Sequence, residues 1–125
     1  MDECIHVLVV DDEEAFRLNM VKLLGTKGID AVAVGNGAEA LAELALNAYQ
    51  AILLDVRLPG LTGLGTLQRI RDSGCQAAVI ILTGHASLDE AQALLALGAK
   101  DYLLKPARIE TVVQKIRNAL GLPGE

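Results

Sequence analysis

Aromatic residues are scarce in this sequence. Its 125 residues include no tryptophan, two tyrosines and one phenylalanine. Hydrophobic residues nevertheless make up 52% of the chain, so a core has to be built from leucine, valine, isoleucine and alanine. The length is typical of one domain, and the composition favours a packed α/β protein over a disordered chain.

Cysteines are also few, and acidic residues outnumber basic ones. Cys4 and Cys75 have no CxxC spacing and no clustered histidines, so the pattern supports neither a zinc site nor a disulfide framework and predicts reduced thiols. The net charge of −5 argues against direct binding of nucleic acid. No basic segment precedes the first apolar run, which is too short for a signal peptide or a membrane span. We therefore expect a cytoplasmic protein with no membrane contact.

Five short apolar runs alternate with five segments of helical periodicity. Several runs are apolar at nearly every position, which is typical of parallel strands covered on both faces. Strict alternation with short connections predicts right-handed crossovers and a (βα)5 doubly wound five-stranded parallel sheet of the α/β class. The predicted strands are Ile5 to Val10, Ile29 to Val34, Ala51 to Leu54, Ala78 to Leu82 and Tyr102 to Leu104.

Each predicted helix carries one apolar stripe at helical spacing. The stripes are Phe16, Met20 and Leu23; Leu41, Leu44 and Ala45; Leu64, Leu67 and Ile70; Ala91, Leu94 and Leu95; and Ile109, Val112, Val113, Ile116 and Leu120.

Capping signals mark several helix ends. Asn36 with Glu39, and Ser87 with Glu90, place a short polar residue three positions before an acid, as at a helix start. The predicted helix stops are the glycines Gly28, Gly74, Gly98 and Gly121.

Polar residues follow four of the five predicted strands. Strand one is followed by Asp11 and Asp12, strand three by Asp55, strand four by Thr83 and strand five by Lys105. In an open parallel sheet, ligands bind beyond the carboxyl ends of the strands. We therefore expect these side chains to lie at one edge of the sheet.

The acids in this set indicate a cation site. Alone, Asp11 and Asp12 with the two glutamates after them could be ordinary acids at a helix start. With Asp55 added, three carboxylates converge and repel one another unless a cation is bound, and oxygen ligands favour Mg²⁺. A lysine at the mouth of a buried strand, as Lys105 is predicted to be, neutralises anionic oxygens. A carboxylate nucleophile, a metal, a hydroxyl and a fixed cation are the groups that phosphoryl transfer needs.

Four motifs in this order resemble the response-regulator receiver family of two-component signal transduction, the CheY-like superfamily. They are Val9-Val10-Asp11-Asp12, Leu54-Asp55-Val56-Arg57-Leu58-Pro59-Gly60-Leu61-Thr62-Gly63, Leu82-Thr83-Gly84, and Gly98-Ala99-Lys100-Asp101-Tyr102-Leu103-Leu104-Lys105-Pro106. The resemblance covers essentially the whole chain. It implies a flavodoxin-like strand order of 2-1-3-4-5, a receiver domain at 1–121, and a linker or chain end at 122–125.

The resemblance also implies roles for the polar residues. Asp55 is expected to accept the phosphoryl group, Asp12 to bind Mg²⁺ directly, Asp11 to bind it through water, and the backbone carbonyl of Arg57 to be a further ligand. A sensor histidine kinase, a phosphotransfer protein or a small phosphodonor is the expected source of the phosphoryl group. The expected protein is a switch with Mg²⁺-dependent self-phosphorylation and self-dephosphorylation rather than a metabolic enzyme.

By the same resemblance, Thr83 and Lys105 bind phosphoryl oxygens and Tyr102 is the switch aromatic. Movement of Thr83 and Tyr102 is expected to change the surface made by the fourth helix, fifth strand and fifth helix. That surface would control an output domain or partner, or form a homodimer. Arg57 and His85 occupy positions that tune the phosphoryl lifetime in the family.

Three local expectations concern the last motif and the first strand. The Lys105–Pro106 bond is expected to be cis, as in the family. Ala107 stands where many members have phenylalanine, which leaves the packing at the start of the fifth helix open. His6 is expected to be a strand residue without a catalytic role.

Three other readings are weaker. A dehalogenase-type phosphatase needs an aspartate two residues after a nucleophilic aspartate on the first strand, and Asp11 is followed there by Glu13. A flavin or nucleotide binder would present glycine, serine and threonine amides after strand one, where this chain has four acids. A pseudo-receiver, which binds partners without phosphorylation, would lack some of the active-site residues that are all present here.

Overall fold

The computed structural model describes residues 4–84 and 88–123, and five strands alternate with five helices along them. The strands are β1 His6–Val10, β2 Asp30–Val34, β3 Ala51–Asp55, β4 Ala78–Thr83 and β5 Asp101–Leu104. The helices are α1 Glu14–Thr26, α2 Gly37–Leu46, α3 Gly63–Asp72, α4 Leu88–Ala96 and α5 Ile109–Ala119.

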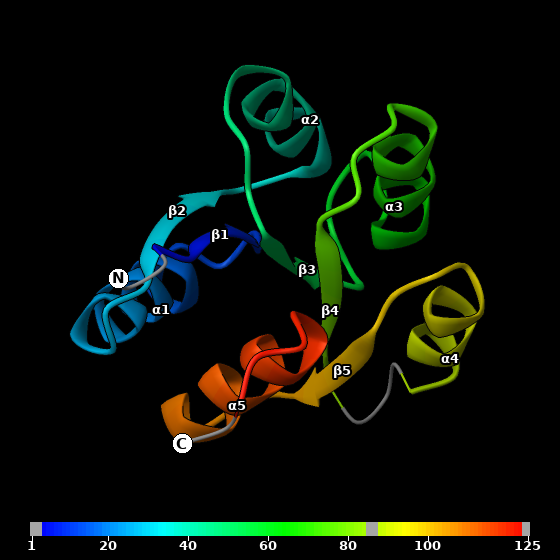
Figure 1. Ribbon diagram of the computed structural model, residues 1–125. Helices are drawn as coiled ribbons and strands as arrows, with labels where there is room; N and C mark the ends of the chain where they lie inside the picture. Colours follow the sequence, from blue (N-terminus) through cyan, green and yellow to red (C-terminus); the bar gives the residue numbers. More distant parts are fainter. Residues whose placement is uncertain (1–3, 85–87, 124–125) are drawn as a thin grey trace.

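All five strands are parallel and lie in the order β2-β1-β3-β4-β5, as predicted. Figure 1 shows α1 and α5 on one face of this sheet and α2, α3 and α4 on the other. One apolar cluster fills the space under each group of helices. The chain therefore has the predicted doubly wound α/β fold.

Burial separates the central strands from the edges. Every residue of β3 and β4 is buried, whereas every residue of β2 is at least partly exposed, and Val32 is 39% exposed. Two residues of the predicted apolar stripes, Ala45 and Leu64, are also exposed. For these two residues the stripe prediction is wrong, because helical spacing alone does not show how far the packed face extends around a helix.

The ends of several strands differ by one residue from the sequence prediction. Ile5 and Ile29 are buried but precede β1 and β2, whereas β3 includes Asp55 and β4 includes Thr83. Two of the polar side chains expected at the sheet edge are therefore the last residues of fully buried strands, so their backbone is fixed by the sheet.

The predicted caps are confirmed where they can be seen. The side chain of Asn36 accepts a hydrogen bond of 2.8 Å from the backbone N–H of Glu39. The carboxylate of Glu39 accepts from the N–H of Gly35 at 2.8 Å, so the acid caps the residue before Asn36. Ser87 lies outside the described residues. The four glycines predicted to end helices have positive φ angles of 72° to 110° and are Gly28, Gly74, Gly98 and Gly121.

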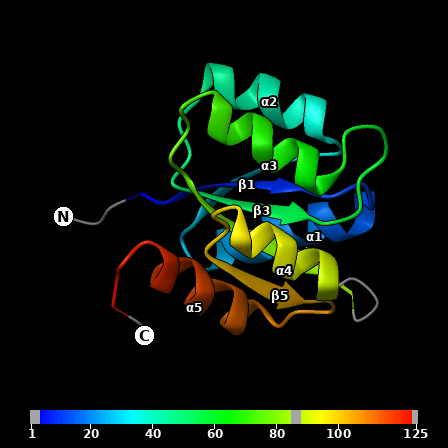
Figure 2. The ribbon, with the colours of Figure 1, turned by 90° about the vertical axis from the view of Figure 1, so that its right-hand side faces the viewer.

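The carboxyl ends of the strands form one edge of the molecule. In Figure 2 the arrowheads of β1, β3 and β5 point to the same side, away from the two chain ends.

In the described part of the chain, no helix is long and apolar enough to cross a membrane.

Candidate functional site

Three carboxylates meet where β1 and β3 end. Ligand oxygens of Asp11, Asp12 and Asp55 all lie within 4.8 Å of one another. Asp11 is fully buried and Asp55 is 8% exposed, whereas Asp12 faces solvent. The predicted convergence of these three residues is confirmed, and its oxygen-only donors match the ligands that Mg²⁺ prefers.

Lys105 brings a cation into the same cluster from the end of β5. Its Nζ lies 2.5 Å from Asp11 Oδ2 and 3.4 Å from Asp55 Oδ2. Glu13 adds a third carboxylate, with Oε1 3.5 Å from Nζ. The ammonium also lies 4.5 Å from the centre of the Phe16 ring, which gives it a cation–π contact. Lys105 is therefore held among anionic oxygens, as the sequence predicts.

The pKa of Asp55 reflects its burial and its closeness to Asp11. Burial raises the pKa of Asp55 above its ordinary value, and the nearby charge of Asp11 adds to the increase. A hydrogen bond from the Arg57 N–H to Asp55 Oδ1, 3.1 Å long, and the charge of Lys105 act in the opposite direction without cancelling it. An added cation would stabilise the ionised form of Asp55.

The pKa of Lys105 is raised by the same group of charges. Burial by itself would lower the pKa of its ammonium, but the ion pairs with Asp11 and Asp55 outweigh burial and raise the pKa. Lys105 therefore remains a cation at the site.

The loop after Asp55 is fixed by close backbone packing. Gly63 begins α3, and its N–H donates to the carbonyl of Val56 at 3.1 Å. A Cβ atom at Gly63 would lie 2.7 Å from the carbonyl oxygens of both Asp55 and Val56. Because these are backbone atoms, a side chain at position 63 would move the loop that carries Asp55.

Arg17 fixes the acidic loop after β1. Its Nη1 donates to the backbone carbonyls of Asp11 at 3.2 Å and Asp12 at 3.3 Å. Sequence reasoning missed Arg17, Phe16 and the role of Glu13. An arginine and an aromatic residue in the first turns of a helix that follows an acidic loop are a usable signal, because those turns pack beside the loop.

Thr83 and Lys105 are joined through the backbone. The N–H of Lys105 donates to the carbonyl of Thr83 at 2.8 Å. The Thr83 side chain is 1% exposed, and its hydroxyl donates to the carbonyl of Gly84 at 2.9 Å. The Lys105–Pro106 bond is cis, as predicted. Ala107 packs against the cluster under α1 and α5.

Tyr102 and Arg57 have side chains that form contacts outside the group of Asp11, Asp55 and Lys105. Tyr102 is 36% exposed, and Lys115 Nζ lies 5.9 Å from the centre of its ring. Arg57 Nη2 pairs with Glu90 Oε1 of α4 at 3.1 Å, so the loop after Asp55 contacts α4. His85 lies outside the described residues.

Comparison with known families identifies this arrangement. Residues 7–117 match the model of the response regulator receiver domain. The chain belongs to this family. A receiver domain is a phosphoacceptor signalling module of two-component response regulators, and the acidic pocket of Asp11, Asp12 and Asp55 is consistent with a phosphoacceptor site. The family assignment made from the four motifs is confirmed.

Curated relatives of this receiver are longer proteins. It is 40% identical over 115 residues to YkoG, an uncharacterized transcriptional regulatory protein of Bacillus subtilis, covering 92% of this chain and 50% of YkoG. It is 37% identical over 114 residues to the DNA-binding transcriptional regulator NtrC of Escherichia coli, covering 91% of this chain and 24% of NtrC. The receiver thus spans half or less of the length of these relatives.

Solved structures share the fold. A receiver domain protein of Clostridium thermocellum aligns with a TM-score of 0.87 at 32% identity, covering 94% of each chain. NtrX of Brucella abortus, solved with ADP, aligns with a TM-score of 0.90 at 27% identity, covering 95% of this chain and 27% of NtrX.

Proposed function

We propose that this receiver takes a phosphoryl group onto Asp55 from a phosphohistidine of a sensor kinase or phosphotransfer protein, or from a small phosphodonor. The observation that carries the proposal is the position of Asp55: a buried carboxylate 3.4 Å from the Lys105 ammonium, within 4.8 Å of two further carboxylates, at the carboxyl edge of the sheet. The domain that carries this function is proposed to be residues 1–121.

In the proposed reaction, a carboxylate oxygen of Asp55 attacks phosphorus and the phosphorus–nitrogen bond of the donor breaks. The electron pair of that bond stays on the imidazole nitrogen, and the product is an acyl phosphate. Lys105 neutralises the added charge, and the hydroxyl of Thr83 donates to a phosphoryl oxygen. Hydrolysis of the acyl phosphate returns the domain to its starting state.

The three carboxylates fit a resident Mg²⁺ ion. We assign Asp12 and Asp55 as direct ligands, Asp11 as a ligand through water, and the backbone carbonyl of Arg57 as a further ligand. Bound there, Mg²⁺ supplies charge neutralisation for the phosphoryl oxygens. The raised pKa of Asp55 supports this assignment, because the protein groups alone leave the ionised carboxylate under-stabilised.

The output is proposed to pass through α4, β5 and α5. Phosphorylation adds negative charge and acceptor oxygens next to Thr83. Thr83 moves toward them, Tyr102 rotates inward, and the balance between two existing conformations shifts. The changed surface controls an output domain or partner, or forms a homodimer. Arg57 and His85 tune the lifetime of the phosphoryl group.

The named relatives suggest the kind of output. Both YkoG and NtrC are described as transcriptional regulators, so we propose that this receiver controls transcription without binding DNA itself. Its net charge of −5 supports the proposal that this domain does not bind DNA directly. The composition and the absence of disulfide signals support a cytoplasmic location.

Phosphorylation with acetyl phosphate and Mg²⁺ tests the proposal by intact-mass spectrometry. Wild-type protein is expected to gain one phosphoryl group, and Asp55→Asn is expected to lose at least about a hundredfold in labelling, because the amide is not a nucleophile. The matched control is Asp72→Asn, at the exposed end of α3, which should label like the wild type. Equal labelling of Asp55→Asn would refute the assignment.

A further inference from the structure

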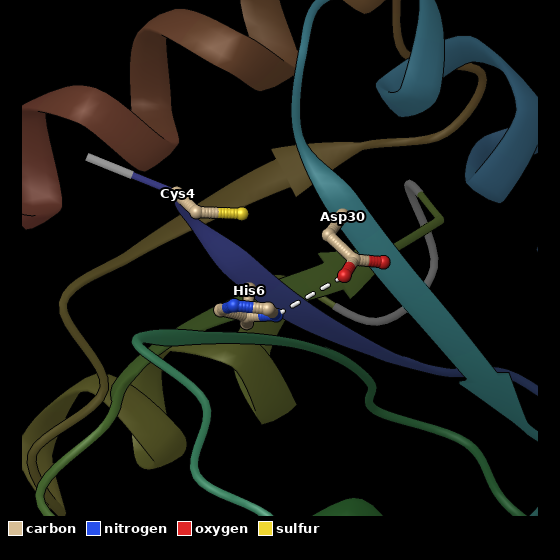
Figure 3. A group of neighbouring side chains, drawn as sticks. All are labelled: Cys4, His6 and Asp30. Carbon is tan, nitrogen blue, oxygen red and sulfur yellow. Dashed lines mark ion pairs between the residues drawn. The ribbon is translucent and has the colours of Figure 1, made fainter. Parts of the chain in front are cut away.

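A second group of metal-ligating side chains lies at the opposite end of the sheet from Asp55. Cys4, His6 and Asp30 each offer a ligand atom, and these atoms lie within 4.8 Å of one another. His6 Nδ1 lies 3.3 Å from Asp30 Oδ2. Figure 3 shows the three side chains beside the starts of β1 and β2.

The strand geometry places them together. Side chains two residues apart lie on the same face of an extended chain, so Cys4 and His6 share one face. His6 and Asp30 are paired residues in the parallel register of β1 and β2, which puts Asp30 on that face as well. Sequence spacing alone gave no support for a metal site at Cys4, because the register that brings Asp30 alongside is not visible in that spacing.

The backbone around the cluster is well fixed. The N–H of Asp30 donates to the carbonyl of Ile5 at 3.0 Å. On the other side of β1, the N–H of His6 donates to Gln50 Oε1 at 2.7 Å, and the N–H of Gln50 donates to the carbonyl of His6 at 3.0 Å. Ile5, between Cys4 and His6, is buried. The three ligands therefore project from an ordered scaffold.

The donor types differ from those of the acidic pocket. A thiolate, an imidazole and a carboxylate together favour Zn²⁺, which takes sulfur, nitrogen and oxygen ligands, over Mg²⁺, which takes oxygen. Two tetrahedral ligands about 2.0–2.2 Å from zinc lie about 3.4 Å apart. The measured 3.3 Å between His6 and Asp30 matches that separation.

We propose that Cys4, His6 and Asp30 bind one Zn²⁺ ion, with water in the fourth position. The thiolate and the carboxylate neutralise the charge of the ion. Access is open, because the side chains of His6 and Asp30 are 41% and 61% exposed and Cys4 is exposed. The ion connects the chain before β1 to β2, an edge strand that pairs with β1 alone, and so stabilises the weaker edge of the sheet.

Cobalt is the spectroscopic probe for this site. Reduced protein is titrated with Co²⁺ in excess Mg²⁺, which occupies the acidic pocket. One equivalent is expected to produce a thiolate-to-cobalt charge-transfer band, together with the strong visible bands of tetrahedral Co²⁺, and Zn²⁺ should displace both. Cys4→Ser is expected to abolish the charge-transfer band. The matched control is Cys75→Ser, which changes the half-buried thiol between α3 and β4 and should leave the band intact.

Competition with a chromophoric chelator measures Zn²⁺ affinity. His6→Gln and Asp30→Asn are each expected to weaken binding by about tenfold or more. Phosphorylation of Asp55 by acetyl phosphate shows that each variant is folded, and its failure in wild type would count against the proposed function without touching the zinc site. A charge-transfer band that survives Cys4→Ser, no band in wild type, or one Co²⁺ per two chains would overturn the proposal.

Discussion

The two ends of the parallel sheet carry ligand clusters of different character. At the carboxyl end, Asp11 and Asp55 are buried and share the Lys105 ammonium. At the amino end, His6 Nδ1 lies 3.3 Å from Asp30 Oδ2, and the two side chains are 41% and 61% exposed. A buried charge depends on its protein partners, whereas water solvates an exposed one. Burial therefore decides how strongly the residues of a cluster depend on one another.

Removing Lys105 should give the largest loss of stability. Lys105→Met leaves the fully buried Asp11 without its cation, and we expect a loss of about 3 kcal/mol in the free energy of unfolding without Mg²⁺. Urea denaturation measures it, and added Mg²⁺ should restore part of the loss by neutralising the same carboxylates. The control is Lys100→Met, at an exposed lysine. Equal stability of the two variants would show that the carboxyl end is no more interdependent than the surface.

Gly63→Ala tests the packing that supports the carboxyl end. Its methyl group would meet the carbonyl oxygens of Asp55 and Val56 at 2.7 Å, so we expect a loss of about 2 kcal/mol and slower phosphorylation of Asp55. The matched control is Gly25→Ala in α1, where the added Cβ meets no atom within 4 Å apart from its chain neighbours and the backbone of its own helix, and helix propensity predicts a small gain. If Gly63→Ala loses no more stability than Gly25→Ala, the loop after Asp55 can move to accommodate the methyl group without loss of stability.

Stability against pH tests the charge of Asp55 itself. Its pKa is raised on folding by burial, so its favourable contribution is complete below the unfolded pKa of about 3.9 and is lost as pH rises through the folded pKa. In metal-free buffer, Asp55→Asn should therefore become more stable relative to wild type as pH rises above the unfolded pKa of about 3.9. Thermal denaturation across this range measures the difference. A constant difference would mean that folding leaves the pKa unchanged.

The smallest effect is expected at the amino end. Without zinc, His6→Gln should change the free energy of unfolding by less than about 0.5 kcal/mol, because the pair with Asp30 is solvated. The same denaturation experiment with Zn²⁺ should separate wild type from the variant. A large loss in metal-free protein would show that the exposed cluster is as interdependent as the buried one.

Much of the carboxyl end could be predicted from the sequence, because the sheet fixes where strands end. Asp11, Asp55 and Lys105 follow apolar runs, and parallel strands bring such residues to one edge. Arg17 and Phe16 of α1 were missed. Their contacts with the loop after β1 and with Lys105 depend on the orientation of the helix relative to that loop. Cys4 and Asp30 were missed for a different reason. Their proximity depends on the register between β1 and β2, which local periodicity does not reveal.

The contact of Phe16 with Lys105 affects when the Lys105 side chain loses its rotational freedom. A free lysine side chain loses up to about 2 kcal/mol of rotational freedom when it is immobilised. Here the aromatic ring at 4.5 Å and the carboxylates around it restrict the ammonium as the protein folds. Little of that freedom remains to be lost when an anion binds. The entropy of ordering Lys105 is therefore lost during folding and not during anion binding.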